Sequence, residues 1–174
     1  GRTSMFTRKS TLAAAALSMF AAAGMFAAAS ANQPPAGRLF VNPQANKCLD
    51  VPGITNRVPG TALQLFDCET SGLELEGKPS DQFWTFGPRG TIRNTLSNLC
   101  IDIAGTNEGD ALEIKACDGR LSQIWIVRQD GFIQNQLTGK CISVGENENQ
   151  YGETPLQLSS CEFADPKSDQ RWSV

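Results

Sequence analysis

The sequence contains no histidine and no Cys-x-x-Cys pair among its 174 residues. Without histidine, the chain lacks the side chain that most often acts as a general base near neutral pH. Without Cys-x-x-Cys, it lacks the common spacings of zinc sites and of thiol redox motifs. Carboxylate pairs such as Glu74 and Glu76 fall in polar segments and are explained by solvated surface charge. We therefore predict a protein that is not an enzyme and that needs no cofactor or metal.

Basic residues are scarce outside the N-terminal segment. Residues 32–174 contain 12 lysines and arginines against 18 aspartates and glutamates. A surface with this negative balance repels nucleic acid and anionic lipid, and no basic stripe with interleaved aromatic residues is present. Nucleic acid is therefore not an expected partner.

One long uncharged run, from Ser10 to Ala31, follows Arg8 and Lys9. A basic flank, an apolar run and the site Ala29-Ser30-Ala31 are typical of a cleaved secretory signal. The alternative is a retained anchor, because Leu12–Ala31 is long enough to cross a bilayer as a helix. High Ala and Leu content predicts a helix over residues 11–31 in either case. We expect residues 1–31 to be a signal peptide or membrane anchor, with residues 32–174 secreted or on the lumenal or periplasmic side of a membrane.

A pattern that recurs three times dominates the rest of the chain. Every tryptophan follows a glutamine by two residues, in the pairs Gln82 and Trp84, Gln123 and Trp125, and Gln170 and Trp172. This spacing places both side chains on one face of a strand, where the ring is buried and the amide is hydrogen-bonded. The pattern predicts one domain of short strands, built from repeats at residues 37–85, 89–126 and 130–174.

The six cysteines follow the same period, two ahead of each Gln-x-Trp motif, as Cys48 and Cys68, Cys100 and Cys117, and Cys141 and Cys161. Among the pairings open to six cysteines, the repeat selects the one that joins the two cysteines of each repeat. Disulfides at this density indicate an oxidising compartment.

The strings Cys48-Leu49-Asp50-Val51 and Gln64-Leu65-Phe66-Asp67-Cys68, together with the threefold Gln-x-Trp, resemble the ricin B-chain type (R-type) lectin domain. The resemblance covers the chain after Pro35. It implies an all-β fold, the β-trefoil, in which six strands form a barrel, three hairpins cap it, and three repeats bury a shared core. It also implies binding of galactose-type or other glycans, with the Gln-x-Trp residues as structural core.

The resemblance further implies which residues contact sugar. The family's pocket uses a carboxylate after the first cysteine, a glutamine in the next strand, an aromatic residue before the second cysteine and a polar residue before Gln-x-Trp. The first repeat has Asp50, Gln64, Phe66 and Asp81 at these positions. An ionised acceptor beside a flat apolar ring suits a sugar with hydroxyls on one side and C–H groups on the other.

The other two repeats depart from this pattern. The second keeps Asp102, the candidate for a second site, but has Lys115 where the ring is needed. The third has Ser143 in place of the carboxylate and Ser159 in place of the ring, with Tyr151 in a nearby loop. For Asp102, and less so for Asp50, the alternative is a turn residue that accepts hydrogen bonds from backbone amides. We expect one working site, in the first repeat.

Two functions remain open at this point. The chain is a carbohydrate-binding module, free or attached to a toxin or hydrolase partner, or it is a degenerate trefoil that serves as a structural subunit of a membrane protein complex. Loss of two pockets favours the subunit, whereas survival of Asp50, Gln64 and Phe66 favours the lectin. We take the lectin as the prediction and the membrane subunit as its alternative.

Overall fold

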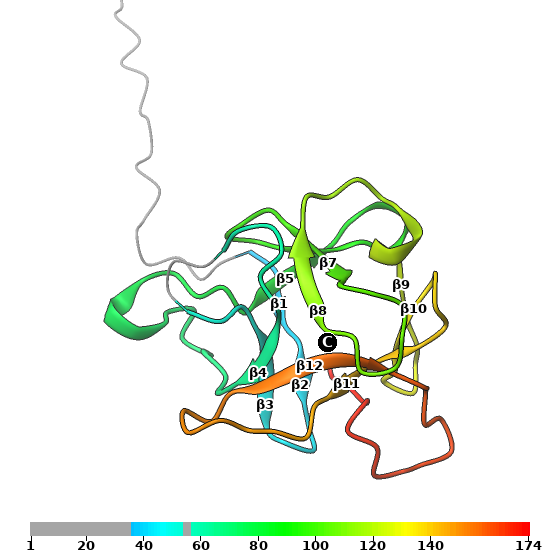
Figure 1. Ribbon diagram of the computed structural model, residues 1–174. Coiled ribbons are helices and arrows are strands. Elements are labelled where there is room, and N and C mark those ends of the chain that lie inside the picture. Colours follow the sequence, from blue (N-terminus) through cyan, green and yellow to red (C-terminus); the bar gives the residue numbers. More distant parts are fainter. Residues whose placement is uncertain (1–35, 54–56) are drawn as a thin grey trace, which may run out of the picture. The chain divides into compact units, whose positions relative to one another are not determined.

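The computed structural model describes residues 36–53 and 57–174. The helix predicted over residues 11–31 lies outside these residues. Within them, short strands are joined by turns, and three single-turn 3-10 segments are present, η1 (Leu75–Gly77), η2 (Pro88–Gly90) and η3 (Leu121–Gln123) (Figure 1). Over this described part of the chain, no helix has the length and hydropathy needed to cross a membrane. The all-β prediction is confirmed.

Each repeat supplies a similar set of strands. The first contains β1 (Arg38–Leu39), β2 (Val41–Asn42), β3 (Lys47–Asp50), β4 (Gln64–Phe66) and β5 (Phe83–Phe86). The second contains β6 (Ile92–Asn94), β7 (Cys100–Ile103), β8 (Leu112–Lys115) and β9 (Trp125–Val127). The third contains β10 (Ile133–Asn135), β11 (Cys141–Val144) and β12 (Thr154–Ser159), and its last strand is reduced to isolated bridges at Arg171 and Ser173.

The strands form two antiparallel sheets, ordered β1-β5-β6-β7-β8 and β2-β3-β4-β12-β11-β10-β9. The second sheet joins the first repeat to the third, because β12 lies between β4 and β11, as Figure 1 shows in orange. The same two repeats also meet where Val41 and Ser173 exchange backbone hydrogen bonds of 2.9 and 2.8 Å. The repeats therefore pack as a ring in which the first contacts the last.

The three tryptophans are buried at equivalent places in the core. Each indole N–H donates to the backbone carbonyl that directly follows the first cysteine of its repeat, at 3.2 Å for Trp84, 3.1 Å for Trp125 and 3.4 Å for Trp172. Burial of so large a ring, with its one polar group satisfied, is a main source of core stability, and removal of such a side chain typically costs about 3–5 kcal/mol.

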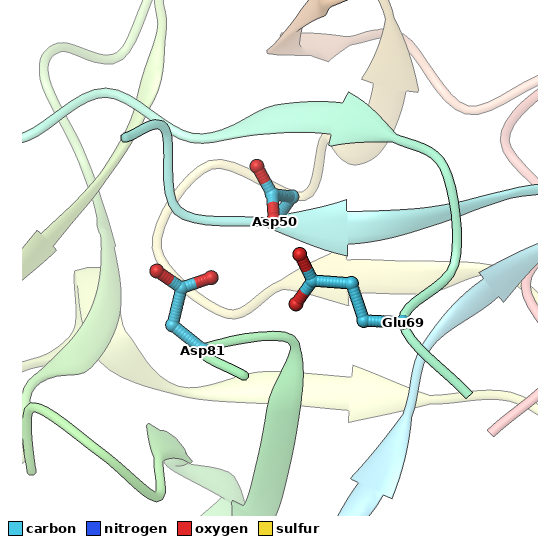
Figure 2. A group of neighbouring side chains, drawn as sticks. All are labelled: Asp50, Glu69 and Asp81. Carbon is cyan, nitrogen blue, oxygen red and sulfur yellow. The ribbon is translucent and has the colours of Figure 1, made fainter. Parts of the chain in front are cut away.

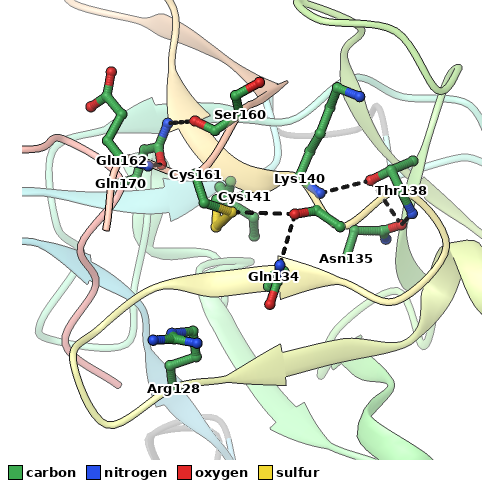
Figure 3. Close-up of a disulfide and its surroundings, with 12 residues drawn as sticks. Arg128, Gln134, Asn135, Thr138, Lys140, Cys141, Ser160, Cys161, Glu162 and Gln170 are labelled. Carbon is green, nitrogen blue, oxygen red and sulfur yellow. Dashed lines mark hydrogen bonds between the residues drawn. A yellow bond between two sulfur atoms is a disulfide. The ribbon is translucent and has the colours of Figure 1, made fainter. Parts of the chain in front are cut away.

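The glutamines of the motif connect this core to the disulfides. Gln170 accepts from the Glu162 amide and donates to the Ser160 carbonyl, both at 3.0 Å, on either side of Cys161 (Figure 3). Gln82 and Gln123 make the equivalent contacts around the second cysteine of their repeats. The disulfides pair as predicted, Cys48 with Cys68, Cys100 with Cys117 and Cys141 with Cys161. The motif thus holds a strand, a disulfide and a loop together three times.

Candidate functional site

A cavity of about 110 Å³ lies beside β3 and β4 of the first repeat. Its lining consists of Asp50, Val51, Gly53, Gln64, Phe66, Glu69, Glu74, Leu75 and Glu153. Three of the four residues predicted to contact sugar, Asp50, Gln64 and Phe66, are therefore brought together. Phe66 and Leu75 provide apolar surface, and Leu75 is 74% exposed. The cavity is smaller than the roughly 300–1,000 Å³ of pockets that enclose a drug-sized ligand, so it suits the edge of one sugar ring.

Asp50 is the polar centre of this cavity. It ends β3 directly opposite Gln64 on β4, and its side chain is 4% exposed. Its Oδ2 accepts from Gln64 Nε2 at 2.7 Å, and its Oδ1 accepts from Gln82 Nε2 at 3.0 Å. Gln82 therefore belongs to the core motif and also fixes the carboxylate of the site.

Asp81, the fourth predicted residue, lies beside the cavity rather than in its lining. It is 1% exposed, and its Oδ2 accepts from Arg57 Nε at 2.9 Å. Arg57 also donates from Nη2 to Glu74 Oε1 at 2.7 Å. The guanidinium thus connects Asp81 to a residue of the cavity wall.

Three carboxylates converge at the cavity, two from its lining, Asp50 and Glu69, and one from Asp81 beside it. Figure 2 shows Glu69 and Asp81 pointing toward Asp50, and an oxygen of each lies within 4.8 Å of the others. Oε2 of Glu69 is buried and has no hydrogen-bond partner within the described part of the chain. Oxygen atoms in this arrangement are of the type that hard cations such as calcium accept as ligands. The group of Asp50, Glu69 and Asp81 is hereafter called the acid cluster.

Burial raises the pKa values of the acid cluster. It brings the pKa of Asp50 from 3.8 to about 8, with a further increase from the charge of Asp81, while the hydrogen bonds from Gln64 and Gln82 oppose the change. Burial likewise raises the pKa of Asp81 to about 7, against the opposing effect of Arg57, and it raises the pKa of Glu69. The cluster therefore takes up protons near neutral pH unless positive charge is placed beside it.

In the second repeat, the residues at the equivalent positions bond to groups of the protein itself. Asp102 is buried and accepts from the Ile103 amide at 2.8 Å and from Gln123 Nε2 at 3.0 Å. Lys115, at the position of Phe66, forms an ion pair with Glu113, at the position of Gln64. The structure thus places Asp102 in contact with a backbone amide, as the turn alternative expects.

In the third repeat, a hydroxyl replaces the carboxylate. Ser143 Oγ donates to Asp169 Oδ1 at 3.2 Å. Tyr151 is 70% exposed in the loop before β12 and does not line the cavity of the first repeat. At the position that Phe66 has in the first repeat, the third repeat has Ser159, which lies opposite Cys141 in the sheet.

The charged and large apolar residues at or beside the cavity that the sequence analysis missed include Arg57, Glu69, Glu74, Leu75 and Glu153. Glu74 and Leu75 belong to an insertion, because 13 residues separate Cys68 from Gln82, whereas five separate Cys117 from Gln123 and eight separate Cys161 from Gln170. The greater length of the connection between Cys68 and Gln82 could have indicated that the first repeat has extra residues beside its pocket. Glu153 comes from the third repeat, and its place depends on the pairing of β12 with β4.

Comparison with known proteins places the chain among carbohydrate-binding folds. The family described as the ricin-type β-trefoil lectin domain matches residues 36–173. Polypeptide N-acetylgalactosaminyltransferase 4 of Caenorhabditis elegans is 26% identical over 137 residues, which are 78% of this chain and 20% of that enzyme. The chain therefore spans about a fifth of the length of this relative.

Solved structures show the same fold. The designed threefold-symmetric protein ThreeFoil has a TM-score of 0.60 at 19% identity, over 77% of this chain and 94% of that one. The C-half of the earthworm R-type lectin, solved in complex with GalNAc, has a TM-score of 0.57 at 19% identity, over 78% of this chain and 95% of that one. The architecture described above is therefore the β-trefoil.

Proposed function

The chain belongs to the family of ricin-type β-trefoil lectin domains, and from this premise we propose that it is a carbohydrate-binding module without catalytic activity, whose sugar site is the cavity of the first repeat. The observation that carries the proposal is the position of Asp50, Gln64 and Phe66 around one cavity. Asp50 accepts hydrogen bonds from adjacent hydroxyls, Gln64 orients it, and Phe66 stacks on the C–H face of the ring.

The proposed ligand is a galactose-type sugar. Support comes from the earthworm lectin, which was solved with GalNAc, and from the family itself. A single shallow site with a few hydrogen bonds is expected to bind near millimolar concentration, about 4 kcal/mol. Attachment to another module or display on a surface would raise the avidity.

We also propose that the domain works on the non-cytosolic side of a membrane. Three disulfides are formed among the described residues. Such bonds persist in oxidising compartments and are rare in the cytosol.

The test is titration of galactose and N-acetylgalactosamine into the protein, followed by NMR. Phe66→Ala should weaken binding by about 1 kcal/mol through loss of the stacking face. Asp50→Ala should weaken it by about 1–3 kcal/mol because sugar hydroxyls are left unpaired. Phe86→Ala is the matched control, since Phe86 is a half-exposed ring that packs against Phe40 away from the cavity. No binding by the unaltered protein at high sugar concentration would refute the proposal.

A further inference from the structure

The cavity of the first repeat continues into two larger cavities on the surface of the same repeat. The second cavity measures about 380 Å³ and the third about 460 Å³, and both volumes fall within the roughly 300–1,000 Å³ of ligand pockets. The residues shared by the first and second cavities are Phe66, Glu69, Glu74 and Leu75. Those shared by the second and third are Asp67, Cys68 and Thr70. The three cavities therefore follow one another and form one groove.

The connection of residues 69–81, which carries the insertion, forms a wall of this groove. Leu73 and Pro79 form an antiparallel bridge across the connection. The Glu74 carboxylate accepts from Arg57 Nη2 at 2.7 Å, which fixes the wall from one side. Because these contacts exist within the protein alone, a ligand that binds along the wall does not have to order it first.

Two leucines of this connection present apolar surface to the groove. Leu73 is 40% exposed and lines the second cavity, and the more exposed Leu75 lines both the first and the second. The ring of Phe66 also borders both cavities, so apolar surface passes from one to the other. Apolar side chains that are gathered at the surface, rather than scattered over it, are typical of ligand-binding grooves.

The rest of the groove combines apolar side chains with oxygen acceptors. Leu39 and Val41 supply apolar surface in the third cavity, and the lining there also includes Asn46, Asp67 and Thr70. Among the described residues that line the three cavities, none is a lysine or an arginine. Apolar side chains interspersed with acceptors suit a chain of neutral sugar residues, because each sugar ring has C–H faces and hydroxyl donors. A single sugar would occupy only the first cavity.

We propose that the groove recognises a neutral oligosaccharide, with its terminal sugar in the first cavity and the following residues in the second and third. The inference rests on the proposed function and names the class of its ligand. Leu73 and Leu75 cover the C–H face of the second sugar residue, and the polar groups around Thr70 bind hydroxyls farther along the chain. Glycans that carry carboxylates or sulfates bind less well, because the described lining has acidic residues and no basic one.

The test compares galactose, lactose and lacto-N-neotetraose by calorimetry. All three are neutral and present a terminal galactose, and they are a monosaccharide, a disaccharide and a tetrasaccharide. Lactose should bind on the order of tenfold more tightly than galactose, because its second residue removes exposed leucine surface from water. The tetrasaccharide should bind more tightly again, because it also reaches the third cavity.

Substitution of leucine by serine separates the second cavity from the first. Leu73→Ser should remove most of the gain of lactose over galactose and leave the affinity for galactose unchanged, since Leu73 lines the second cavity and not the first. Unchanged galactose binding also shows that the variant is folded. Leu121→Ser is the matched control, because Leu121 is 57% exposed in the equivalent connection of the second repeat. It should leave all three affinities unchanged. If Leu73→Ser keeps the full gain, the inference is wrong.

The outcomes also distinguish this inference from the proposed function. Binding of galactose with no gain for the longer sugars overturns the oligosaccharide assignment and leaves the lectin proposal standing. Failure of all three sugars to bind removes both proposals. A gain for octyl galactoside that the oligosaccharides do not share would assign the groove to an apolar aglycone, and it would overturn the inference.

Discussion

Asp50 and Asp81 bring two carboxyl groups into one buried region beside the guanidinium of Arg57. Asp50 bonds to the amides of Gln64 and Gln82, and Asp81 bonds to Arg57. Burial raises the pKa of both carboxyl groups above their ordinary value of 3.8, to about 8 for Asp50 and about 7 for Asp81. The residues that form the site therefore also make the stability of the protein depend on pH.

The free energy of unfolding should fall as pH rises from about 5 to about 8. In this window the folded protein binds more protons than the unfolded chain, because its carboxyl pKa values are raised. The protonated carboxyl groups of Asp50 and Asp81 contribute fully to stability below pH 3.8, the pKa of Asp in the unfolded chain. This contribution is lost as pH rises through their pKa values in the folded protein, about 7 and about 8. A loss on the order of 2 kcal/mol is expected, reduced by relaxation around the charges. Urea unfolding at a series of pH values measures it.

Asp81→Asn should flatten this dependence, because it removes one of the two coupled carboxyl groups. Asp130→Asn is the control: Asp130 is exposed and its pKa is lowered by Arg128, so its contribution changes only at acidic pH. A slope between about pH 5 and 8 that is the same in both variants would contradict the assignment to the buried pair.

At the scale of elements, the insertion between Cys68 and Gln82 distinguishes the first repeat. It folds back on itself, with hydrogen bonds of 2.9 Å from the Glu74 amide to the Lys78 carbonyl and 3.1 Å from the Gly77 amide to the Glu74 carbonyl. The short turn places Glu74 and Leu75 in the cavity wall. In the second repeat, the connection between Cys117 and Gln123 has only five residues. Gln123 nevertheless makes the same hydrogen bonds around the second cysteine as Gln82 does in the first repeat.

Replacement of residues 70–79 by Gly-Arg, the two residues that follow Asp118 in the second repeat, should leave the trefoil folded. Shortening a surface loop changes the cost of closure by less than about 1 kcal/mol for each halving of its length. Galactose binding should weaken, because the replacement removes Glu74 and Leu75 from the cavity wall. Circular dichroism checks the fold, and calorimetry measures the affinity for galactose. A folded variant that binds galactose as tightly as the unaltered protein would show that the wall plays no part in binding.

The features that could be predicted from the sequence are those that occur in all three repeats. Gln82, Trp84 and the cysteine pairs each have two counterparts, so their alignment revealed strand faces, core positions and disulfides without any knowledge of the tertiary structure. Asp50, Gln64 and Phe66 were placed together by the family resemblance. Arg57, Glu74 and Leu75 have no periodic counterpart, and Glu153 reaches the cavity only through packing between repeats. Position along the chain does not determine such contacts.

At the scale of the whole molecule, the first and third repeats meet along one seam. β4 pairs with β12, with Leu65 opposite Thr154 and Gln64 opposite Pro155. The ammonium group of Lys47 donates to the Gly152 carbonyl at 2.6 Å and pairs with Glu148 at 3.0 Å. Glu153, which directly precedes β12, lines the cavity of the first repeat. The site is therefore built by residues from both ends of the described domain.

This seam sets an order of events during synthesis. A nascent chain that stops before β12 already contains Asp50, Gln64 and Phe66, yet β4 then lacks its outer partner strand and the cavity lacks one wall. If the proposed site binds sugar, recognition should appear only when the last third of the domain has been made and has folded against the first, and retention on a sugar matrix should then report a finished chain. A protein that ends at Gly145 should pass through such a matrix although it has every predicted sugar contact of the first repeat, while the full chain is retarded. If the shortened chain were also retarded, the first repeat would form its pocket without waiting for the third.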